Sequence, residues 1–361
     1  MNLLIVNAGS SSLKLRVLDE ADSVIEEKDV SDWDGSPDPI DAMAFDAVVH
    51  RVVHGGDRFD GAALVDDEVE AAIEELVSLA PLDQPRALEL IRHTRSGDRP
   101  VVACFDTAYH RTIPVASATY ALPAGWRKRF GLRKFGFHGL SHAYVAGQVP
   151  RILERQVPRL VSAHLRAGAS LCAIADGRSV ETTMGFTPLD GLVMATRSGS
   201  VDPGLLLWLQ TSGGLSAEEI GEALEHRSGL LGLSERSGDL PEILTGIENG
   251  DPDCRLAYEV YLHRLVGEIA RMVAALGGAD AIAFTGGVGE HSAPLRAAVM
   301  RRLEWLGVVV DAEANESSAS VISAPDSGIA TCVIEAREDL TMAAQARAVL
   351  RSYSSGRRRP R

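Results

Sequence analysis

The chain has 361 residues, and its 36 basic and 50 acidic side chains give a formal net charge of −14. This length predicts two domains, each large enough to bury its own core. The acidic balance argues against a nucleic-acid partner, no apolar run reaches the roughly 18–20 residues of a membrane helix, and the amino terminus has no basic segment typical of a secretory signal. The four widely spaced cysteines predict reduced thiols in the cytoplasm rather than a disulfide framework or a zinc site.

The first predicted elements form a hairpin. Residues 3–6 are an unbroken apolar run, typical of a strand that is covered on both faces. Small polar residues follow at 7–12, and apolar and basic residues then alternate over 13–17, which predicts a second, paired strand. A similar pattern recurs at 160–175. It indicates either two copies of one α/β unit facing each other across a cleft, or a chance similarity.

The polar turn of this hairpin carries an amide, three hydroxyls and an ammonium group between Asn7 and Lys14. Such a loop can donate hydrogen bonds to phosphate oxygens, and Asn7 could ligate a hard cation. An ordinary polar turn is the alternative.

Two charged residues follow predicted strands. Arg51 comes after the apolar residues 47–49 and before a double glycine, a setting that suits a cation held near a phosphate or carboxylate. Asp106 follows the apolar run 100–104, at the end of a strand where α/β proteins place functional groups. The alternative for Arg51 is a surface arginine before a turn, and the alternative for Asp106 is a helix N-cap.

His138 and His142 are four residues apart, on one face if the segment is helical. With no third ligand in sight, we favour His138 as a donor to a phosphoryl oxygen over a transition-metal site. The long stretch 181–204 is rich in Gly, Thr and Pro, as functional loops often are, and Arg197 within it is a second candidate phosphate clamp.

The second half of the chain predicts three clear helices. A capping box at 216–219 begins one, residues 256–276 show helical spacing from Leu256 to Leu276, and 340–351 form a final amphipathic helix. The glycine-rich segment 285–290 follows a short apolar strand and could present backbone N–H groups to a ligand. The basic residues 354–361 predict a disordered tail, with an interaction arm as the alternative.

Taken together, these segments resemble the acetate kinase family over roughly residues 2–350, in six ordered motifs at 3–14, 50–56, 105–114, 136–142, 181–192 and 285–290. The resemblance implies an α/β fold of duplicated actin-like (ribonuclease H-like) domains, namely 1–106 plus 340–353, and a nucleotide-binding domain over 107–339. It implies reversible phosphoryl transfer between ATP and acetate, giving acetyl phosphate and ADP. Mg²⁺ or Mn²⁺ would be the cofactor, and the chain would form a homodimer in the cytoplasm.

The resemblance also assigns roles to individual residues. Asn7 and Glu338 would hold the metal ion. The catalytic residues would be Arg51, Asp106, His138 and Arg197. The acetate methyl group would bind at Val53, Leu82, Phe137 and Pro188. The nucleotide and its phosphates would bind at Ser10, Ser12, Lys14, His164, Arg166, Gly168, Asp239, Gly287, Val288 and Gly289.

Several positions depart from the family pattern, chiefly at the nucleotide end. At 164–168 the family usually has His-Leu-Gly-Asn-Gly, whereas this chain has Arg166 in place of the first glycine and Ala167 in place of the asparagine. Pro241 stands where the family has an arginine, and Asp83 and Gln84 stand where it has His and Asn. These changes leave two alternatives open: a donor other than ATP such as pyrophosphate, or a catalytically impaired paralogue that only binds a ligand. A third alternative is a longer acid as acceptor, as in the related butyrate kinases, but the small residues Val53, Leu82 and Pro188 speak against it.

Overall fold

The computed structural model describes residues 1–9, 12–81 and 83–356, the last three of them by backbone alone. Ser10, Leu82 and residues 357–361 of the predicted tail therefore lie outside the described residues. The chain divides into two compact units, the first of residues 1–111, 137–144 and 337 onward, the second of residues 112–136 and 145–336. Compared with the predicted boundaries, the first unit gains residues 107–111, 137–144 and 337–339.

The first unit is built on a six-stranded sheet in the order β3-β2-β1-β4-β6-β5. Its strands are β1 (Leu3–Ala8), β2 (Ser12–Leu18), β3 (Val24–Ser31), β4 (Ala47–Val52), β5 (Ala63–Leu64) and β6 (Val101–Phe105). Its helices are α1 (Asp38–Asp41), α2 (Asp67–Glu75), α3 (Gln84–Arg95) and α15 (Glu338–Gly356). Short 3₁₀ turns lie at Val77–Leu79 and at Ala108–Thr112, where the second unit begins.

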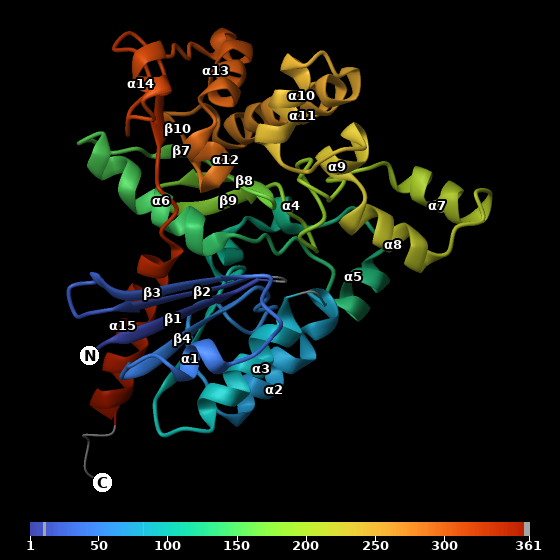
Figure 1. Ribbon diagram of the computed structural model, residues 1–361. Helices are drawn as coiled ribbons and strands as arrows, with labels where there is room; N and C mark the ends of the chain where they lie inside the picture. The colour runs from blue at the N-terminus through green and yellow to red at the C-terminus, as the bar shows by residue number, and fades with distance from the viewer. Residues whose placement is uncertain (10–11, 82, 357–361) are drawn as a thin grey trace. The chain divides into compact units, whose positions relative to one another are not determined.

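Strand β1 is covered on both faces, which explains the unbroken apolar run of its residues 3–6. Leu4 and Val6 pack in a core with residues of α2 and α3, whereas Leu3 and Ile5 pack against α15. Within this unit, Figure 1 shows α15 on one side of the sheet and α2 and α3 on the other. Successive side chains of a strand point to opposite faces, so both rows must be apolar until the strand reaches the sheet edge.

The second unit is built on a five-stranded sheet in the order β11-β10-β7-β8-β9. Its strands are β7 (Arg159–Leu165), β8 (Ala169–Ala175), β9 (Arg178–Thr182), β10 (Ala281–Thr285) and β11 (Ala330–Val333). Its helices are α4 (Val115–Ala118), α5 (Ala124–Phe130), α7 (Pro203–Thr211), α8 (Ala217–His226), α9 (Gly229–Ser234), α10 (Leu240–Glu248), α11 (Pro252–Leu276), α12 (Gly286–His291), α13 (Ala293–Arg302) and α14 (Ala312–Glu316), with a 3₁₀ turn at Glu304–Leu306. Helix α6 (Gly139–Ile152) begins in the first unit and ends in the second.

The two sheets share one topology, which confirms the predicted duplication. In the first, β1, β2 and β3 form an antiparallel meander, and β4 and β6 then add in parallel beyond β1. In the second, β7, β8 and β9 repeat the meander, and β10 and β11 add in parallel beyond β7. The weak sequence repeat therefore marks the first hairpin turn of each copy.

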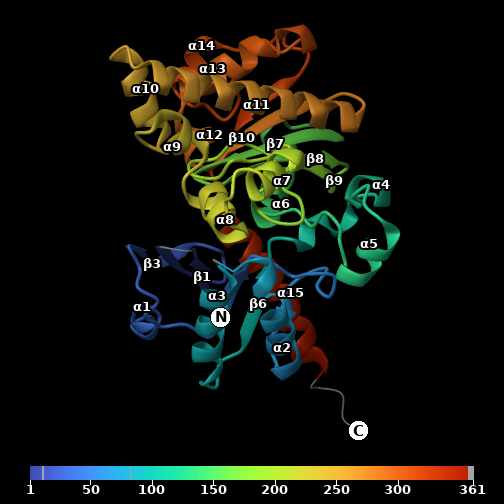
Figure 2. The ribbon, with the colours of Figure 1, turned by 90° about the vertical axis from the view of Figure 1, so that its right-hand side faces the viewer.

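Helix α11 supports the second sheet. It packs against β7, β8 and β9, and α9 and α10 pack on it in turn, as the view of this unit in Figure 2 shows. The predicted capping box of α8 is present, with Ser216 and Glu219 exchanging hydrogen bonds. One predicted core position is wrong: Leu256 is 53% exposed, because Cys254 and Ala257 take the buried face of α11 in the first turn.

Two predicted element ends are also corrected. Strand β4 continues to Val52, so Arg51 lies within the strand rather than after it. Helix α15 continues to Gly356, so the predicted tail begins at least three residues later than expected. Among the described residues, no helix combines the length and the apolar character needed to cross a membrane.

His50 is a buried titratable group in this core. It lies 1% exposed on β4, and its Nε2 is 2.9 Å from the hydroxyl of Thr94 on α3. Burial lowers the pKa of His50 from 6.5 to about 3. The folded chain therefore keeps this ring neutral at pH values where the unfolded chain takes up a proton.

We expect His50 to make the protein acid-sensitive. Its contribution to stability is complete above pH 6.5 and is lost as the pH falls toward 3, at about 1.4 kcal/mol per pH unit. Urea unfolding of the wild type and of His50→Gln between pH 7 and 5 should show a shallower pH slope in the variant. Thr94→Val, which removes the hydrogen bond but keeps the histidine, should retain the wild-type slope. Equal slopes for wild type and His50→Gln would contradict this role.

Candidate active site

Three polar side chains meet where β1, β4 and β6 end. These strands are parallel neighbours, so their carboxyl ends lie at one edge of the sheet. Asn7 continues the row of Leu3 and Ile5 that faces α15, and Arg51 continues the row of Ala47 and Val49. Asp106 likewise follows Val102 and Cys104. The site therefore begins where the apolar rows beneath α15 become polar.

Arg51 is held by both neighbours. Its Nε lies 3.1 Å from each carboxylate oxygen of Asp106, and its Nη2 lies 2.6 Å from Oδ2. Its Nη1 donates to Oδ1 of Asn7 at 3.0 Å. A guanidinium has five N–H donors, and these bonds use three of them. Within the described residues, one N–H on each terminal nitrogen remains for a ligand, and the side chain is 19% exposed.

The charges of this cluster are fixed by burial and pairing. Burial by itself would lower the pKa of Arg51, but the Asp106 carboxylate outweighs it and the pKa is raised, so the guanidinium stays charged. Asp106 is 1% exposed, and burial raises its pKa although Arg51 opposes this effect. Glu338, the first residue of α15, adds a further negative charge that acts on both groups.

His138 follows on the same unit, one residue before α6. Its backbone is left-handed at φ 57°, and its N–H is hydrogen-bonded to Asp106. The next residue must be glycine, because a Cβ on Gly139 would lie 2.1 Å from the carbonyl oxygen of Asp106. His142 is fully buried, its ring lies edge-on to that of His110 at 5.8 Å, and its backbone N–H donates to the carbonyl of His138 at 3.0 Å.

Two of the predicted methyl-pocket residues are described in this unit. Val53 and Phe137 are 7% and 1% exposed, and the ring of Phe137 packs edge-on against His54 at 5.5 Å. Lys14 lies directly opposite Asn7 in the β1–β2 hairpin, and Ser12 closes that hairpin through its carbonyl oxygen, which accepts from Gly9.

Gln84 has a structural role that the sequence did not reveal. The side chain is fully buried, accepts from the N–H of His54 at 3.1 Å and donates to its carbonyl at 2.9 Å. It thereby fixes the turn after β4, which follows Arg51. The signal was present only as a departure from the family pattern, because the contact joins residues 30 positions apart.

The second unit contains a pocket of about 210 Å³. It brings together Arg166, Asp239 and Val288 of the predicted nucleotide site, and it is lined by Arg166, Ala167, Ala195, Leu230, Gly238, Asp239, Leu240, Tyr261 and Val288. His164 and Gly168 flank this lining along the chain, His164 buried on β7 and Gly168 in the turn before β8. Gly287 is near by in sequence, and a Cβ there would meet open space.

Arg166 borders this pocket. It is exposed and makes no ion pair within the described part of the chain. Its Cγ lies 2.8 Å from the point where a Cβ on Gly286 would be, so this glycine, at φ 78°, admits the arginine stem. Pro241 occupies the first turn of α10, where proline fits because its missing N–H has no helical partner.

Arg197 lies in the second unit with Pro188. Its Nε donates to Glu225 of α8 at 2.8 Å, and the arginine is 22% exposed. Both residues belong to the long irregular segment between β9 and α7. Arg197 is thus already paired with a carboxylate, and a phosphate ligand would share or replace that pairing.

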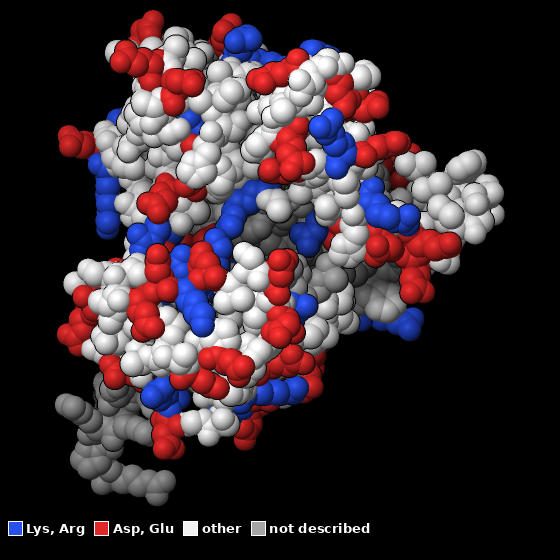
Figure 3. Space-filling view, viewed as in Figure 1, with Lys and Arg blue, Asp and Glu red and all other residues white. Residues whose placement is uncertain are grey.

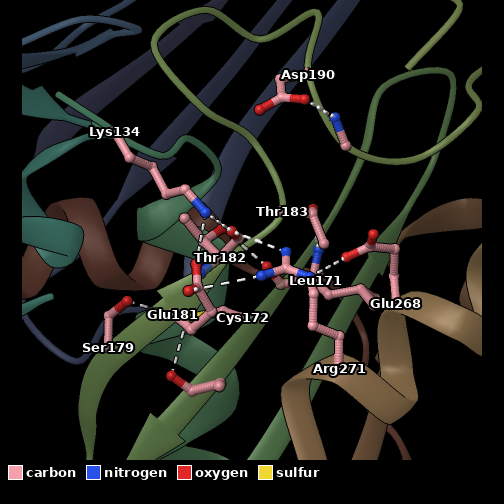
Figure 4. A network of polar contacts seen from close by, with 12 residues as sticks. Lys134, Leu171, Cys172, Ser179, Glu181, Thr182, Thr183, Asp190, Glu268 and Arg271 are labelled. Atoms are coloured by element: carbon pink, nitrogen blue, oxygen red, sulfur yellow. Dashed lines mark hydrogen bonds and ion pairs between the residues drawn. The ribbon is translucent and has the colours of Figure 1, made fainter. Parts of the chain in front are cut away.

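A network of ion pairs anchors the start of this segment (Figure 4). Lys134 donates to Glu181 at 2.6 Å and to the carbonyl of Thr182 at 2.9 Å, and the two charged side chains are only 12% and 11% exposed. Arg271 of α11 approaches Glu181 at 3.6 Å and pairs with Glu268 at 2.7 Å. The network joins β9, α11 and the segment that leads to Phe137 and His138.

The described residues contain no cluster of three or more His, Cys, Asp or Glu side chains that could hold a metal ion by themselves. Asn7, Asp106 and Glu338 nevertheless offer amide and carboxylate oxygens in one unit. Such hard oxygen donors, few in number, suit Mg²⁺, which commonly keeps waters and binds substrate phosphates. On the face seen in Figure 3, acidic and basic side chains are interspersed, without the broad basic surface that nucleic acids require.

Comparison with known proteins points to one family. The sequence model described as the Acetokinase family matches residues 38–344. An acetate kinase of Deinococcus radiodurans is 40% identical, with 94% of this chain and 96% of the relative aligned. An acetate kinase of Micrococcus luteus is 42% identical over 95% of this chain and 98% of its own.

Solved structures agree with this assignment. The acetate kinase of Porphyromonas gingivalis superposes with a TM-score of 0.88 at 33% identity, over 97% of this chain and 99% of its own. A propionate kinase from Francisella tularensis gives the same TM-score at 32% identity, over 95% and 98%. These likenesses confirm the predicted α/β fold of duplicated actin-like domains.

We expect Glu181→Gln to destabilise the protein by about 1–3 kcal/mol, because it leaves the nearly buried Lys134 ammonium without its counter-charge. Glu268→Gln is the matched control in the same network. Glu268 is 27% exposed, and its loss should cost less than about 1 kcal/mol. Denaturant unfolding measures both values, and equal effects would show that the Lys134–Glu181 pair does not anchor this segment.

Proposed function

Because the chain belongs to the acetokinase family, we propose that it catalyses the reversible transfer of a phosphoryl group between ATP and acetate, giving acetyl phosphate and ADP. The observation that carries this proposal is the Arg51 cluster. It holds a guanidinium rigidly at the end of three parallel strands with two N–H donors left for a ligand.

Phosphoryl transfer mainly requires positive charge that is held in position. Phosphoryl transfer passes through a loose transition state whose equatorial oxygens carry the charge, so fixed donors contribute most of the catalysis. The free N–H groups of Arg51 would bind oxygens of the transferring group, and His138 would donate to the same oxygens. Asp106 would keep the guanidinium oriented. Arg197, once turned from Glu225, would be the second cation.

Acetate would be selected by apolar contacts with its methyl group. Val53 and Phe137 are buried beside the Arg51 strand, and Pro188 is the family-matched residue of the long loop. A difference of one methylene in such a pocket is worth only about 1–3 kcal/mol. Propionate should therefore also react, with a lower kcat/KM.

Mg²⁺ is the proposed cofactor. Asn7 and Glu338 would hold it, directly or through water, with Asp106 near by. When bound, the ion neutralises charge on the phosphate oxygens. Asn7 already orients its amide oxygen by accepting from Arg51, so one residue links the cation site to the guanidinium.

The nucleotide would bind at the pocket of the second unit. Leu230, Leu240 and Tyr261 give it apolar walls, and Arg166 supplies a charge for the phosphates. Asp239 begins α10 without capping it, so its carboxylate is not committed to that helix.

We also propose a homodimer in the cytoplasm. Helix α7 (Pro203–Thr211) has no charged residue and exposes Leu205, Leu207 and Trp208 at 45%, 62% and 59%. An exposed apolar group of this kind is typical of an interaction surface. The four cysteines are buried free thiols, as expected in a reducing compartment.

Trapping of acetyl phosphate as the hydroxamate, with acetate, Mg²⁺ and ATP, tests the activity. We expect Arg51→Ala to lower kcat about 100-fold or more while changing the KM for acetate much less, because the guanidinium acts on the transition state. Arg58→Ala is the control, since Arg58 is an exposed arginine of the same unit paired with Glu75. No hydroxamate with the wild type would refute the activity, and a change confined to KM would refute the role of Arg51.

A second candidate is the same transfer from another donor, such as pyrophosphate. The supporting observation is Arg166, which stands at the pocket where the family has glycine and makes no ion pair with the residues that the structure describes. Pyrophosphate is compact and highly charged, so it would gain more from this charge than from the apolar walls.

A donor panel decides between the two candidates. If ATP is the donor and the altered loop limits its use, Arg166→Gly/Ala167→Asn should raise kcat/KM for ATP about tenfold or more. If pyrophosphate is the donor, the same double change should lower its kcat/KM. Phosphoryl transfer from neither donor, together with thermal stabilisation by ADP, would indicate a binding paralogue.

A further inference from the structure

Arg296 on α13 is a completely buried cation. It is 0% exposed, and each of its five N–H donors has an acceptor. Nε donates to Oδ1 of Asn315 at 2.9 Å, and Nη2 donates to the carbonyl of Asn315 at 2.7 Å and to the hydroxyl of Ser318 at 2.9 Å. Nη1 donates to the carbonyls of Gly289 and Glu290 at 2.9 and 2.7 Å.

No carboxylate forms an ion pair with this guanidinium in the described part of the chain. Its charge is instead met by carbonyl oxygens at the ends of two helices: Gly289 and Glu290 near the end of α12, and Asn315 near the end of α14. The carboxyl end of a helix carries partial negative charge and favours a cation. Burying a charge without hydrogen-bond partners costs much free energy. The folded protein must therefore keep the ends of α12 and α14 together around Arg296.

Helix α12 connects this anchor with the pocket. It is only six residues long, Gly286–His291. Val288 lines the pocket, and the next two residues give their carbonyls to Arg296. The side chain of Glu290 also accepts from the N–H of Ala336 at 3.0 Å. A shift at the carboxyl end of so short a helix must move its first turn as well.

We propose that Arg296 is a positioning residue for the nucleotide, acting through α12 to set the first turn of that helix against the pocket. This inference rests on the proposed function, because it takes the pocket to be the nucleotide site. Arg296 does not touch the ligand, since all its donors are used within the protein. Its loss should weaken nucleotide binding and leave the acetate side unaffected, because none of its hydrogen bonds involves Arg51, His138 or Arg197.

The test compares Arg296→Met, Arg296→Lys and Ser318→Ala with the wild type. Arg296→Met removes all five donors, and Arg296→Lys keeps the charge with three donors. Ser318→Ala removes the hydroxyl that accepts from Nη2 of Arg296. Arg301→Met is the matched control, an exposed arginine on the same helix. The readouts are the Kd of Mg-ADP by calorimetry, the KM values for ATP and acetate, and the melting temperature.

We expect the Kd for ADP and the KM for ATP to rise about tenfold or more in Arg296→Met, by an intermediate factor in Arg296→Lys and about two- to threefold in Ser318→Ala. The KM for acetate should change less than twofold, and Arg301→Met should match the wild type. If Arg296→Met does not fold, Arg296→Lys and Ser318→Ala decide.

A fall in melting temperature with unchanged Kd for ADP, or equal changes in both KM values, would overturn the positioning role. A wild type that binds ADP but forms no acetyl phosphate would instead refute the proposed reaction alone, and the effect of the variants on ADP binding would still judge Arg296. A wild type that binds no ADP would refute both.

Discussion

The first unit depends on one constraint: a buried carboxylate must be paired, and here a guanidinium of the neighbouring strand pairs it. Asp106 is 1% exposed at the end of β6, where an uncompensated charge would be strongly unfavourable. Arg51 of β4 meets it with three contacts to the carboxylate oxygens and then reaches Asn7 of β1. Both the contacts of the site and the packing of the apolar core therefore require the strand order β1-β4-β6 and its parallel register. A shift of one residue in β4 would turn Arg51 to the other face of the sheet.

The sequence predicted those parts of the site that depend on local pattern. The apolar run of β1 and the alternation of β2 predicted the hairpin, and the acid after β6 placed Asp106 correctly at a strand end. Asn7 was expected in the polar turn after the first strand but lies within β1. The same reliance on apolar runs predicted that β4 ends at Val49, although it continues to Val52. His50 and Arg51 are polar, and nothing local shows that one is buried against Thr94 and the other paired with Asp106.

Contacts between distant residues escaped prediction for a related reason. Gln84 and His54 are separated by 30 positions, so from the sequence the glutamine was noted only as a departure from the family pattern. Arg296, Arg301 and Arg302 are three similar arginines on one helix, and helical spacing alone does not say which one meets the ends of α12 and α14. At Leu256 the helical spacing gave a wrong prediction, since Cys254 and Ala257 take the buried face of α11 there. The departures at Pro241 and Gln84 are accommodated by the backbone, whereas Arg166 changes the charge of the pocket itself.

The three arginines that define this protein differ in how many donors they have left. Arg296 uses all five within the protein, so it can only hold structure in place. Arg51 uses three and is partly exposed, so it is rigid and still has N–H groups for a ligand. Arg166 is exposed with no ion pair in the described residues, so its charge is available but its position is fixed only through its stem. A catalytic cation must be both oriented and unsatisfied, and Arg51 meets this requirement if it has the proposed role. If the pocket of the second unit is the nucleotide site, the charge of Arg166 would still have to be ordered by the phosphate that binds there.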